Sequence, residues 1–258
     1  MRPHSRRSRG YSYSRYQEPI SFAIRSGAVL ALAGVTLFFA GPVGYRLGLL
    51  SLSVAADRVF VWGANLAGIG ALLALIGVFI TFGRRREGRR GFGRALLAVA
   101  VGVVAFRAGG RLPLGTTPPA IHDVTTDMQH PPEYATVAQL RRDAPGLAYA
   151  GEALAAKQRT AYPDIQPLLL PVPQEQAFTQ ALAVVRDLGW TLVSADGSAG
   201  RIEASAATRL FGTVDDVVVR VSPADGGSRV DVRSTSREPN GPASNVGRVR
   251  ALLDALRS

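Results

Sequence analysis

Long uncharged stretches near the N-terminus, each bounded by charged residues, constrain this chain more than any other feature. No charged residue occurs in the 20 positions between Arg25 and Arg46, or in the 25 positions from Val59 to Gly83. A helix rises about 1.5 Å per residue, so each run is long enough to cross the roughly 30 Å hydrocarbon core of a bilayer. The sequence therefore predicts a membrane protein with spanning helices at about 26–45 and 59–83.

The second run contains small residues, which are common in membrane helices and could let a neighbouring helix approach closely. They are Gly63, Ala67, Gly70, Ala71 and Ala74.

A third apolar segment is shorter than the first two. Only 12 uncharged residues, Ala95 to Phe106, separate Arg94 from Arg107, so both arginines would have to extend toward the membrane surface. A span over 92–110 is the expectation, and a helix lying flat on the membrane is the alternative. Residues 26–110 are thus expected to form a bundle of three transmembrane helices.

The loops differ in their content of arginine, which predicts the orientation. Six arginines precede the first span and six lie between Arg84 and Arg94, whereas the intervening loop has only Arg46 and Arg58. Arginine-rich loops stay in the cytoplasm, so residues 1–25 are expected to be a cytoplasmic leader. Three crossings would place the C-terminal part in the periplasm of a Gram-negative cell, and two would leave it cytoplasmic. A cleaved signal peptide is disfavoured because further apolar segments follow.

The charge balance of the rest of the chain argues against nucleic acid as a partner. The net charge is +11, but residues 1–110 hold 15 arginines and three acidic residues, whereas residues 111–258 hold 15 basic and 16 acidic residues. The second part therefore lacks the basic excess that neutralises phosphates. The expected partners are the lipid bilayer and an envelope protein or lipid. The chain has no cysteine, and no motif implies a cofactor.

The C-terminal part is predicted to be an extended tether followed by an α+β domain. Prolines within 111–165 favour an extended path, with one short helix near Ala153 to Thr160. Strand patterns separated by turn signals occupy much of 166–258, and amphipathic helices are expected from Pro173 and from about Val246. The expected strands are 166–170, 191–195, 201–207, 216–221 and 229–237. The fold class is α+β, with an antiparallel sheet of four to five strands backed by two helices.

One face of this sheet is predicted to be polar, because Val230 and Val232 alternate with Asp231 and Arg233 on the last strand. The residues that could gather on or beside this face are Arg209, Asp215, Asp216, Arg220, Arg233 and Arg237. They could form an anion site, since the arginine side chain binds carboxylate or phosphate in bidentate fashion. The preferred interpretation is a solvent-exposed ladder of ion pairs, each contributing about 0.2–1 kcal/mol, because acidic and basic residues are matched in number.

A second candidate site lies in the tether. Its residues are of the types that bind zinc or manganese, namely His122, Asp123, Asp127 and His130. Their spacing matches no known metal motif, and Pro131 and Pro132 favour an extended path that would separate the side chains. The preferred interpretation is a solvated tether whose polar side chains bond local backbone.

Several short motifs resemble one bacterial family. The motifs are Tyr162-Pro163-Asp164, Gly200 to Ala204, Phe211 to Val217, Val232 to Arg237 and Asn245 to Arg248, preceded by Ile121 to Asp127. In this order they are similar to the segments of the domain of unknown function 1499 family, over roughly residues 115–258. The resemblance implies membrane association and an α+β domain, and it brings no established activity.

The leading functional hypothesis is a non-enzymatic, membrane-anchored protein whose α+β domain binds a partner protein or an envelope molecule. It depends on the anchor, on the balanced charge of the domain and on the absence of a nucleophile elbow or zinc-protease motif from the sequence. One alternative is a metal-assisted hydrolase that uses the histidines and aspartates of the tether. The other is a carrier of an apolar ligand, with the helix that begins at Pro173 closing over the sheet as a lid.

Overall fold

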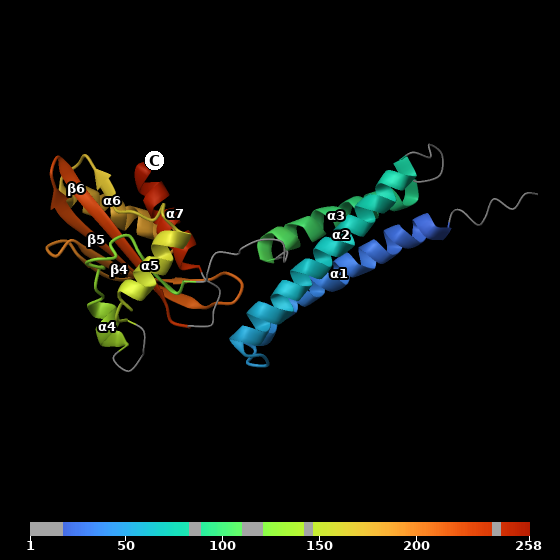
Figure 1. Ribbon diagram of the computed structural model, residues 1–258, viewed down its shortest axis with the longest axis horizontal. Coiled ribbons are helices and arrows are strands. Elements are labelled where there is room, and N and C mark those ends of the chain that lie inside the picture. The colour runs from blue at the N-terminus through green and yellow to red at the C-terminus, as the bar shows by residue number, and fades with distance from the viewer. Residues whose placement is uncertain (1–17, 83–88, 110–120, 142–146, 239–243) are drawn as a thin grey trace, which may run out of the picture. The chain divides into compact units, whose positions relative to one another are not determined.

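The computed structural model describes residues 18–82, 89–109, 121–141, 147–238 and 244–258. The chain divides into two compact units, Met1–Gly115 and Thr116–Ser258. The first unit is helical and the second combines a sheet with helices (Figure 1). Most of the predicted leader, the arginine-rich loop at 83–88 and the beginning of the tether at 110–120 lie outside the described residues.

The first unit contains the predicted apolar helices. These are α1 (Glu18–Arg46), a π-helical turn η2 (Val54–Phe60) that continues into α2 (Val61–Phe82), and α3 (Arg89–Gly109). Two segments of the described residues are long and apolar enough to cross a membrane, Phe22–Arg46 and Val54–Phe79. By length and composition, the described residues therefore support two of the three predicted spans. The apolar part of α3 is only Ala95–Gly109, because the helix begins with a stretch that contains three arginines.

Small residues bring α1 and α2 into backbone contact, as the sequence suggested for α2. The pairs that meet are Gly27–Ala74, Ala31–Gly70, Gly34–Ala67 and Phe38–Gly63. A β-carbon added to Gly34 would lie 2.2 Å from the backbone nitrogen of Ala67, and one added to Gly70 would lie 2.3 Å from that of Ala31. The two helices are antiparallel, and larger side chains at these positions would force them apart.

Helix α3 packs along α2 in the same close manner. A β-carbon on Gly102 would lie 2.5 Å from the carbonyl oxygen of Ala67, and one on Gly109 would lie 2.3 Å from the ring of Phe60. Between Gly102 and Gly109 the neighbour changes from Ala67 of α2 to Phe60 at the end of η2, which precedes α2. Helix α3 is therefore antiparallel to α2 and lies alongside its apolar length.

The second unit is built on a six-stranded antiparallel sheet. Its order is β1-β6-β5-β4-β3, and β2 also pairs with β6. The strands are β1 (Asp123–Thr125), β2 (Leu168–Leu170), β3 (Thr191–Asp196), β4 (Arg201–Ala207), β5 (Val214–Ala224) and β6 (Gly227–Ser236). The α+β class is confirmed. The sixth strand, β1, lies in the predicted tether, where three residues are too few to show an alternating pattern.

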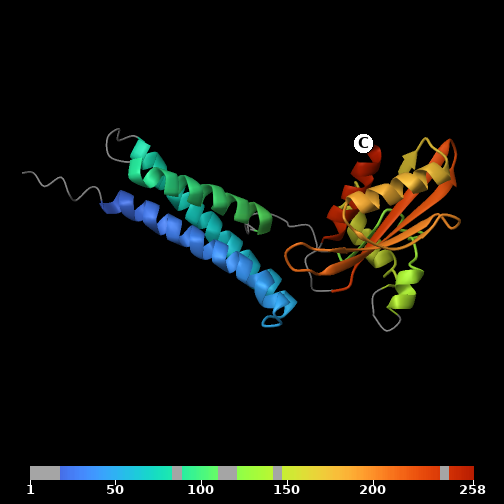
Figure 2. The same ribbon diagram turned by 180° about the vertical axis from the view of Figure 1, so that it is seen from behind.

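Two helices cover one face of this sheet, as predicted (Figure 2). They are α6 (Gln174–Asp187) and α7 (Asn245–Arg257). Ala177, Ala181 and Val185 of α6 are fully buried against valines of β5 and β6 and leucines of α7. Helix α6 is thus part of the core, so its packing does not support the lid of an apolar-ligand carrier.

The opposite face, predicted to be exposed, is covered by the part of the segment 121–141 that follows β1. This segment includes α4 (Thr136–Leu140), and Val137 packs with Tyr134 on Val218 of the sheet (Figure 2). The residues predicted to be a separate tether therefore belong to the same compact unit as 166–258.

Helix α5 (Glu152–Ala161) closes the outer edge of β1. The side-chain amide of Gln158, fully buried, accepts a hydrogen bond from the Thr125 N–H (3.0 Å) and donates one to the Thr125 carbonyl (2.6 Å). One side chain thus makes the two hydrogen bonds that another strand would make.

Candidate functional site

The polar face of the sheet carries a buried network of ion pairs. Asp216 and Asp231 are fully buried, and Arg233 is 2% exposed. The predicted alternation along β6 is present, but the expectation of a solvent-exposed ladder is wrong because the 121–141 segment and α4 lie over these side chains. Burial makes the pairing of each charge obligatory, since an unpaired charge there would be costly.

Arg233 lies at the centre of the contact between β6 and the covering segment. Its Nε and Nη2 donate to the two carboxylate oxygens of Asp123 at 2.9 and 2.8 Å, and Nη2 also donates to the Leu147 carbonyl. The guanidinium lies 5.3 Å from the ring centre of Tyr134 and 5.5 Å from that of Tyr149. Burial alone would lower the pKa of Arg233, but Asp123 outweighs it and raises the pKa. The arginine therefore stays charged and fixes the segment to the sheet.

Asp216 forms a second pairing point, on β5. It accepts from Arg237 Nη2 at 2.7 Å, from Arg141 Nη1 at 2.5 Å and from Ser205 Oγ at 2.8 Å. The hydrogen bonds that Arg237 donates to Asp216 raise the pKa of Arg237. The hydroxyl of Tyr134 donates to the Asp216 carbonyl, and burial raises the pKa of this phenol.

The neighbouring Asp215 points to the opposite face, because successive side chains of a strand alternate. It accepts from Arg248 at 2.6 Å and from Ser236 at 2.8 Å, and Ser244 also donates to it. Asp215 thereby holds the start of α7. The predicted residue set is therefore split between two faces, and Arg209 lies exposed in the turn between β4 and β5.

Asp127 and Asp231 share a pair of arginines beside the 129–133 segment. Arg220 donates to both carboxylates at 2.9 Å, and Arg229 donates to Asp127 at 3.1 Å and to Asp231 at 3.0 and 3.1 Å. Burial alone would raise the pKa of Asp127. The backbone N–H groups of His130 and Gln129, with the two arginines, outweigh that effect and lower the pKa.

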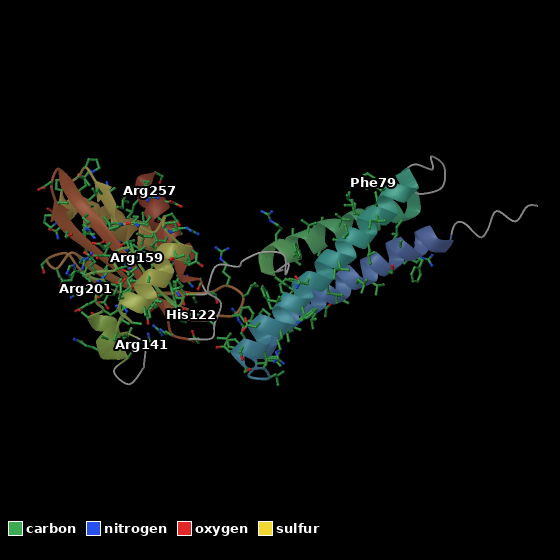
Figure 3. The ribbon with its side chains drawn as sticks, viewed as in Figure 1. Phe79, His122, Arg141, Arg159, Arg201 and Arg257 are labelled. Carbon is green, nitrogen blue, oxygen red and sulfur yellow. The ribbon has the colours of Figure 1, made fainter. Side chains whose placement is uncertain are left out.

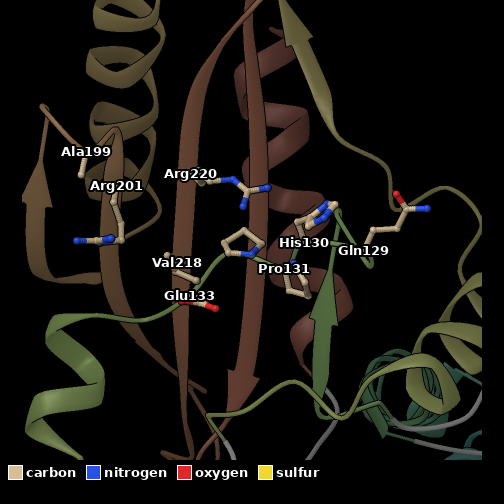
Figure 4. A pocket seen from close by; sticks show the side chains of 9 residues that line it. Gln129, His130, Pro131, Glu133, Ala199, Arg201, Val218 and Arg220 are labelled. Carbon is tan, nitrogen blue, oxygen red and sulfur yellow. The ribbon is translucent and has the colours of Figure 1, made fainter.

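A pocket of about 400 Å³ opens beside this cluster, between the 129–133 segment and strands β4 and β5 (Figure 4). It is lined by Gln129, His130, Pro131, Pro132, Glu133, Ala199, Arg201, Val218 and Arg220. Arg201 and Arg220 are partners across the β4–β5 pairing. Figure 4 shows the guanidinium of Arg220 extending toward His130. The pocket thus brings together basic side chains from two strands and one loop.

A family model described as a protein of unknown function (DUF1499) matches residues 123–258, more than half of the chain. The chain belongs to the DUF1499 family. The match begins at β1 and ends after α7, so the covering segment is part of the family's domain, as are the sheet and helices. No curated protein and no solved structure matches the chain.

Within the DUF1499 domain, the predicted metal residues do not converge. No group of three or more potential metal ligands occurs among the described residues, which include all four predicted positions. Asp123 and Asp127 each pair with arginines, and His130 lies exposed at the pocket. The carboxylates of the alternative metal site are thus already engaged by arginines, in line with the preferred interpretation that these residues do not form a metal site.

Glu203 is a structural residue of the domain that sequence reasoning missed. This fully buried side chain on β4 accepts from the backbone N–H groups of Ala135, Thr136 and Val137 at 2.7–3.1 Å, which fixes the start of α4 on the sheet. The sequence carries no signal for this contact, because a glutamate in a short strand usually faces solvent.

Arg201 was also missed, although it lines the pocket. It lies 3.3 Å from Glu203, and Figure 3 marks it on the same unit as Arg141 and His122. The available signal was its place at the start of a predicted strand, two residues before Glu203. In the structure this place is opposite Arg220 on β5.

Proposed function

We propose that this DUF1499 protein is a membrane-anchored binding protein. Three helices cross the cytoplasmic membrane, which in a Gram-negative cell is the inner membrane. The N-terminus is cytoplasmic, and the unit Thr116–Ser258 faces the periplasm or the cell exterior. There it binds a partner protein or an envelope molecule and catalyses no reaction.

The packing of α3 on α2 is the observation that carries this proposal. Gly102 lies against Ala67, and Gly109 lies against Phe60 near the start of α2. A helix that follows the apolar length of a spanning neighbour in this way crosses with it and does not lie flat on the surface. The short apolar part of α3 is compatible with a crossing if its flanking arginines reach toward the lipid head groups.

The orientation follows from the antiparallel pairing of the helices together with the arginine content of the loops. Because α1 and α2 are antiparallel, the leader and the loop at 83–88 belong to the same side of the membrane. Both are rich in arginine, which favours the cytoplasm for that side. The C-terminal end of α3, and with it the α+β domain, then belongs to the other side.

The state of the carboxylates favours binding over catalysis. A general base needs a carboxylate that can take a proton near neutral pH. Asp123, Asp216 and Asp231 each accept hydrogen bonds from arginine, and the pKa of Asp127 is lowered. These groups hold the domain together, and the pocket beside them offers a place for a ligand.

Site-directed labelling tests the proposed topology in the full-length chain, which contains no natural cysteine. Single variants Ser8→Cys, Ser53→Cys and Ser198→Cys place a thiol in the leader, in the loop before α2 and in the exposed turn after β3. In spheroplasts treated with a membrane-impermeant maleimide, Ser53→Cys and Ser198→Cys should be labelled, and Ser8→Cys only after lysis. Labelling of Ser53→Cys with protection of Ser198→Cys would mean that α3 does not cross, and the proposal would fail.

A further inference from the structure

We infer that the pocket between the 129–133 segment and strands β4 and β5 binds an anionic group, a carboxylate or a phosphate, that carries a compact apolar body. This inference rests on the proposed binding function and names the chemistry of the ligand.

The buried or half-buried carboxylates beside the pocket, which do not line it, are already occupied. Asp127 accepts from two backbone N–H groups with one oxygen and from Arg220 and Arg229 with the other. Asp231 accepts four hydrogen bonds, from Arg220, Arg229 and Thr126. Glu203 accepts three backbone N–H groups. A carboxylate has roughly four acceptor positions, so little capacity remains on these groups.

The donors that face the pocket are only partly used. Arg220 hydrogen-bonds through Nη2, while its Nε and Nη1 have no partner among the described residues. Arg201 approaches Glu203 only through Nε, and its two terminal nitrogens have no partner within the described part of the chain. Both side chains are about one third exposed and line the pocket. The pocket therefore presents more guanidinium donors than the single carboxylate of its lining, Glu133, can satisfy, and an anion would use the surplus.

The charge of the lining agrees with this assignment. Arg201 and Arg220 contribute two positive charges to the lining and the exposed Glu133 contributes one negative charge. Both arginines also pair with acids outside the lining, Arg201 with Glu203 and Arg220 with Asp127 and Asp231. The side chains of His130 and Gln129 are exposed and add donors that can point toward a ligand oxygen.

The size and the remaining walls indicate more than a bare ion. A volume of about 400 Å³ falls within the range of small-molecule sites. Pro131 and Ala199 add accessible apolar surface, and Pro131 and Pro132 bring no backbone N–H donors. An apolar group attached to the anion would lie against these residues.

Binding of simple probes to the full-length protein in nanodiscs of phosphatidylcholine tests the inference. Calorimetric titrations would compare phenyl phosphate and benzoate with phenol, which keeps the ring and lacks the anion, and with inorganic phosphate, which lacks the ring. We expect the two ring anions to bind at least tenfold more tightly than phenol or inorganic phosphate. Equal affinity for phenol, or no binding of either ring anion at millimolar concentration, would overturn the assignment.

Two arginine variants assign the binding to this pocket. Arg201→Gln removes the donors with the fewest structural contacts and should weaken phenyl phosphate binding at least tenfold. Arg250→Gln is the matched control, since Arg250 pairs with Asp164 on the exposed surface and does not line the pocket. Both variants are made with Trp62→Phe so that Trp190 alone reports on the fold of this domain. Unchanged binding by Arg201→Gln, with Trp190 fluorescence like that of the parent, would contradict the proposal.

A further arm separates the two sources of such an anion. Replacing part of the phosphatidylcholine by phosphatidic acid should weaken phenyl phosphate binding by competition if the ligand is a lipid head group, and should leave it unchanged if the ligand is a free molecule. Either result supports an anion site. If these titrations fail while the cysteine variants are labelled as expected, the anion site is rejected and the proposed topology stands.

Discussion

Two arginine–aspartate pairs of the α+β domain show how strongly burial changes the role of the same chemistry. Arg233 binds Asp123 through two nitrogens and lies beside two tyrosine rings, with the guanidinium 2% exposed. Arg250 binds Asp164 in the same bidentate manner, at 2.7 and 2.9 Å, and is 46% exposed. If one partner of the buried pair is removed, water cannot reach the other partner to replace the lost hydrogen bonds. At the exposed pair, water can do so.

Arg233→Lys should therefore destabilise the domain by about 2–3 kcal/mol, because lysine cannot reproduce the bidentate hydrogen bonds and leaves buried acceptors unsatisfied. Arg250→Lys is the matched control and should cost less than about 1 kcal/mol. Urea unfolding of the full-length chain in detergent, with Trp62→Phe so that Trp190 alone reports on this domain, gives both values. Equal losses in the two variants would show that burial does not set the strength of the pair.

The lowered pKa of Asp127 predicts how stability changes with pH. Its folded-state pKa lies below the ordinary value of 3.8, so the carboxylate stabilises the fold above about pH 4, and this contribution is lost as the pH falls through the folded-state pKa. Asp127→Asn should lose about 1–3 kcal/mol at neutral pH, and the difference from the parent protein should shrink below pH 4. Unfolding by urea at a series of pH values measures this difference. A constant difference down to pH 2 would contradict the assignment.

For single residues, the sequence predicted which charged side chains share the polar face of the sheet. It did not predict the segment that covers them. Asp216, Arg220, Asp231 and Arg233 follow from strand alternation. Their burial depends on residues about 100 positions away, such as Thr126, which donates to Asp231. No local pattern contains that information.

Among the elements, α1 and α2 depend on glycines that a single side chain would disturb. Gly34→Leu should weaken their packing, because its β-carbon would lie 2.2 Å from the Ala67 backbone nitrogen. Overpacking costs about 1–3 kcal/mol, which lowers the unfolding temperature of a unit of this size by several degrees. Thermal unfolding of the detergent-solubilised chain, with Trp190→Phe so that Trp62 reports on this unit, measures the loss.

Gly93→Leu is the control for that measurement. Gly93 lies in α3, is exposed, and has nothing within 4 Å of an added β-carbon. Its substitution should leave the unfolding temperature nearly unchanged. An equal loss in both variants would indicate a general effect of leucine and not a defect of the α1–α2 contact.

Element prediction succeeded where a pattern is long or is bounded by turn residues. Strands β3 to β6 lie close to their predicted ranges because alternation and the Asp-Gly turns fix them. Strand β1 and helix α4 are three and five residues long, and their positions depend on β6 and on Glu203. For α3, the predicted span of 92–110 includes Arg94 and Arg107, whereas the apolar part of the helix is only Ala95–Gly109.

For the whole molecule, the two units differ in the surface that they present. Helices α1 to α3 expose many large apolar side chains, such as Leu32, Leu72 and Phe79, the last of which Figure 3 labels. In the described part of the second unit, the exposed large apolar side chains are Leu140, Leu169 and Leu210. The first surface suits lipid and the second suits water. Charge balance and apolar runs were sufficient to predict this division from sequence. The start of the α+β domain, however, was predicted at residue 166, which is too late. The segment from 121 to 165 packs on strands that come after it in the sequence.

The Gln158 side chain that occupies the edge of β1 has a consequence under the membrane anchoring that we propose. Confinement to two dimensions crowds neighbouring copies together, and an open strand edge is a template for joining one copy to the next. The amide of Gln158 already bonds both backbone groups of Thr125. Neighbouring copies of this domain therefore cannot pair their strands through the backbone of Thr125 and aggregate by that route.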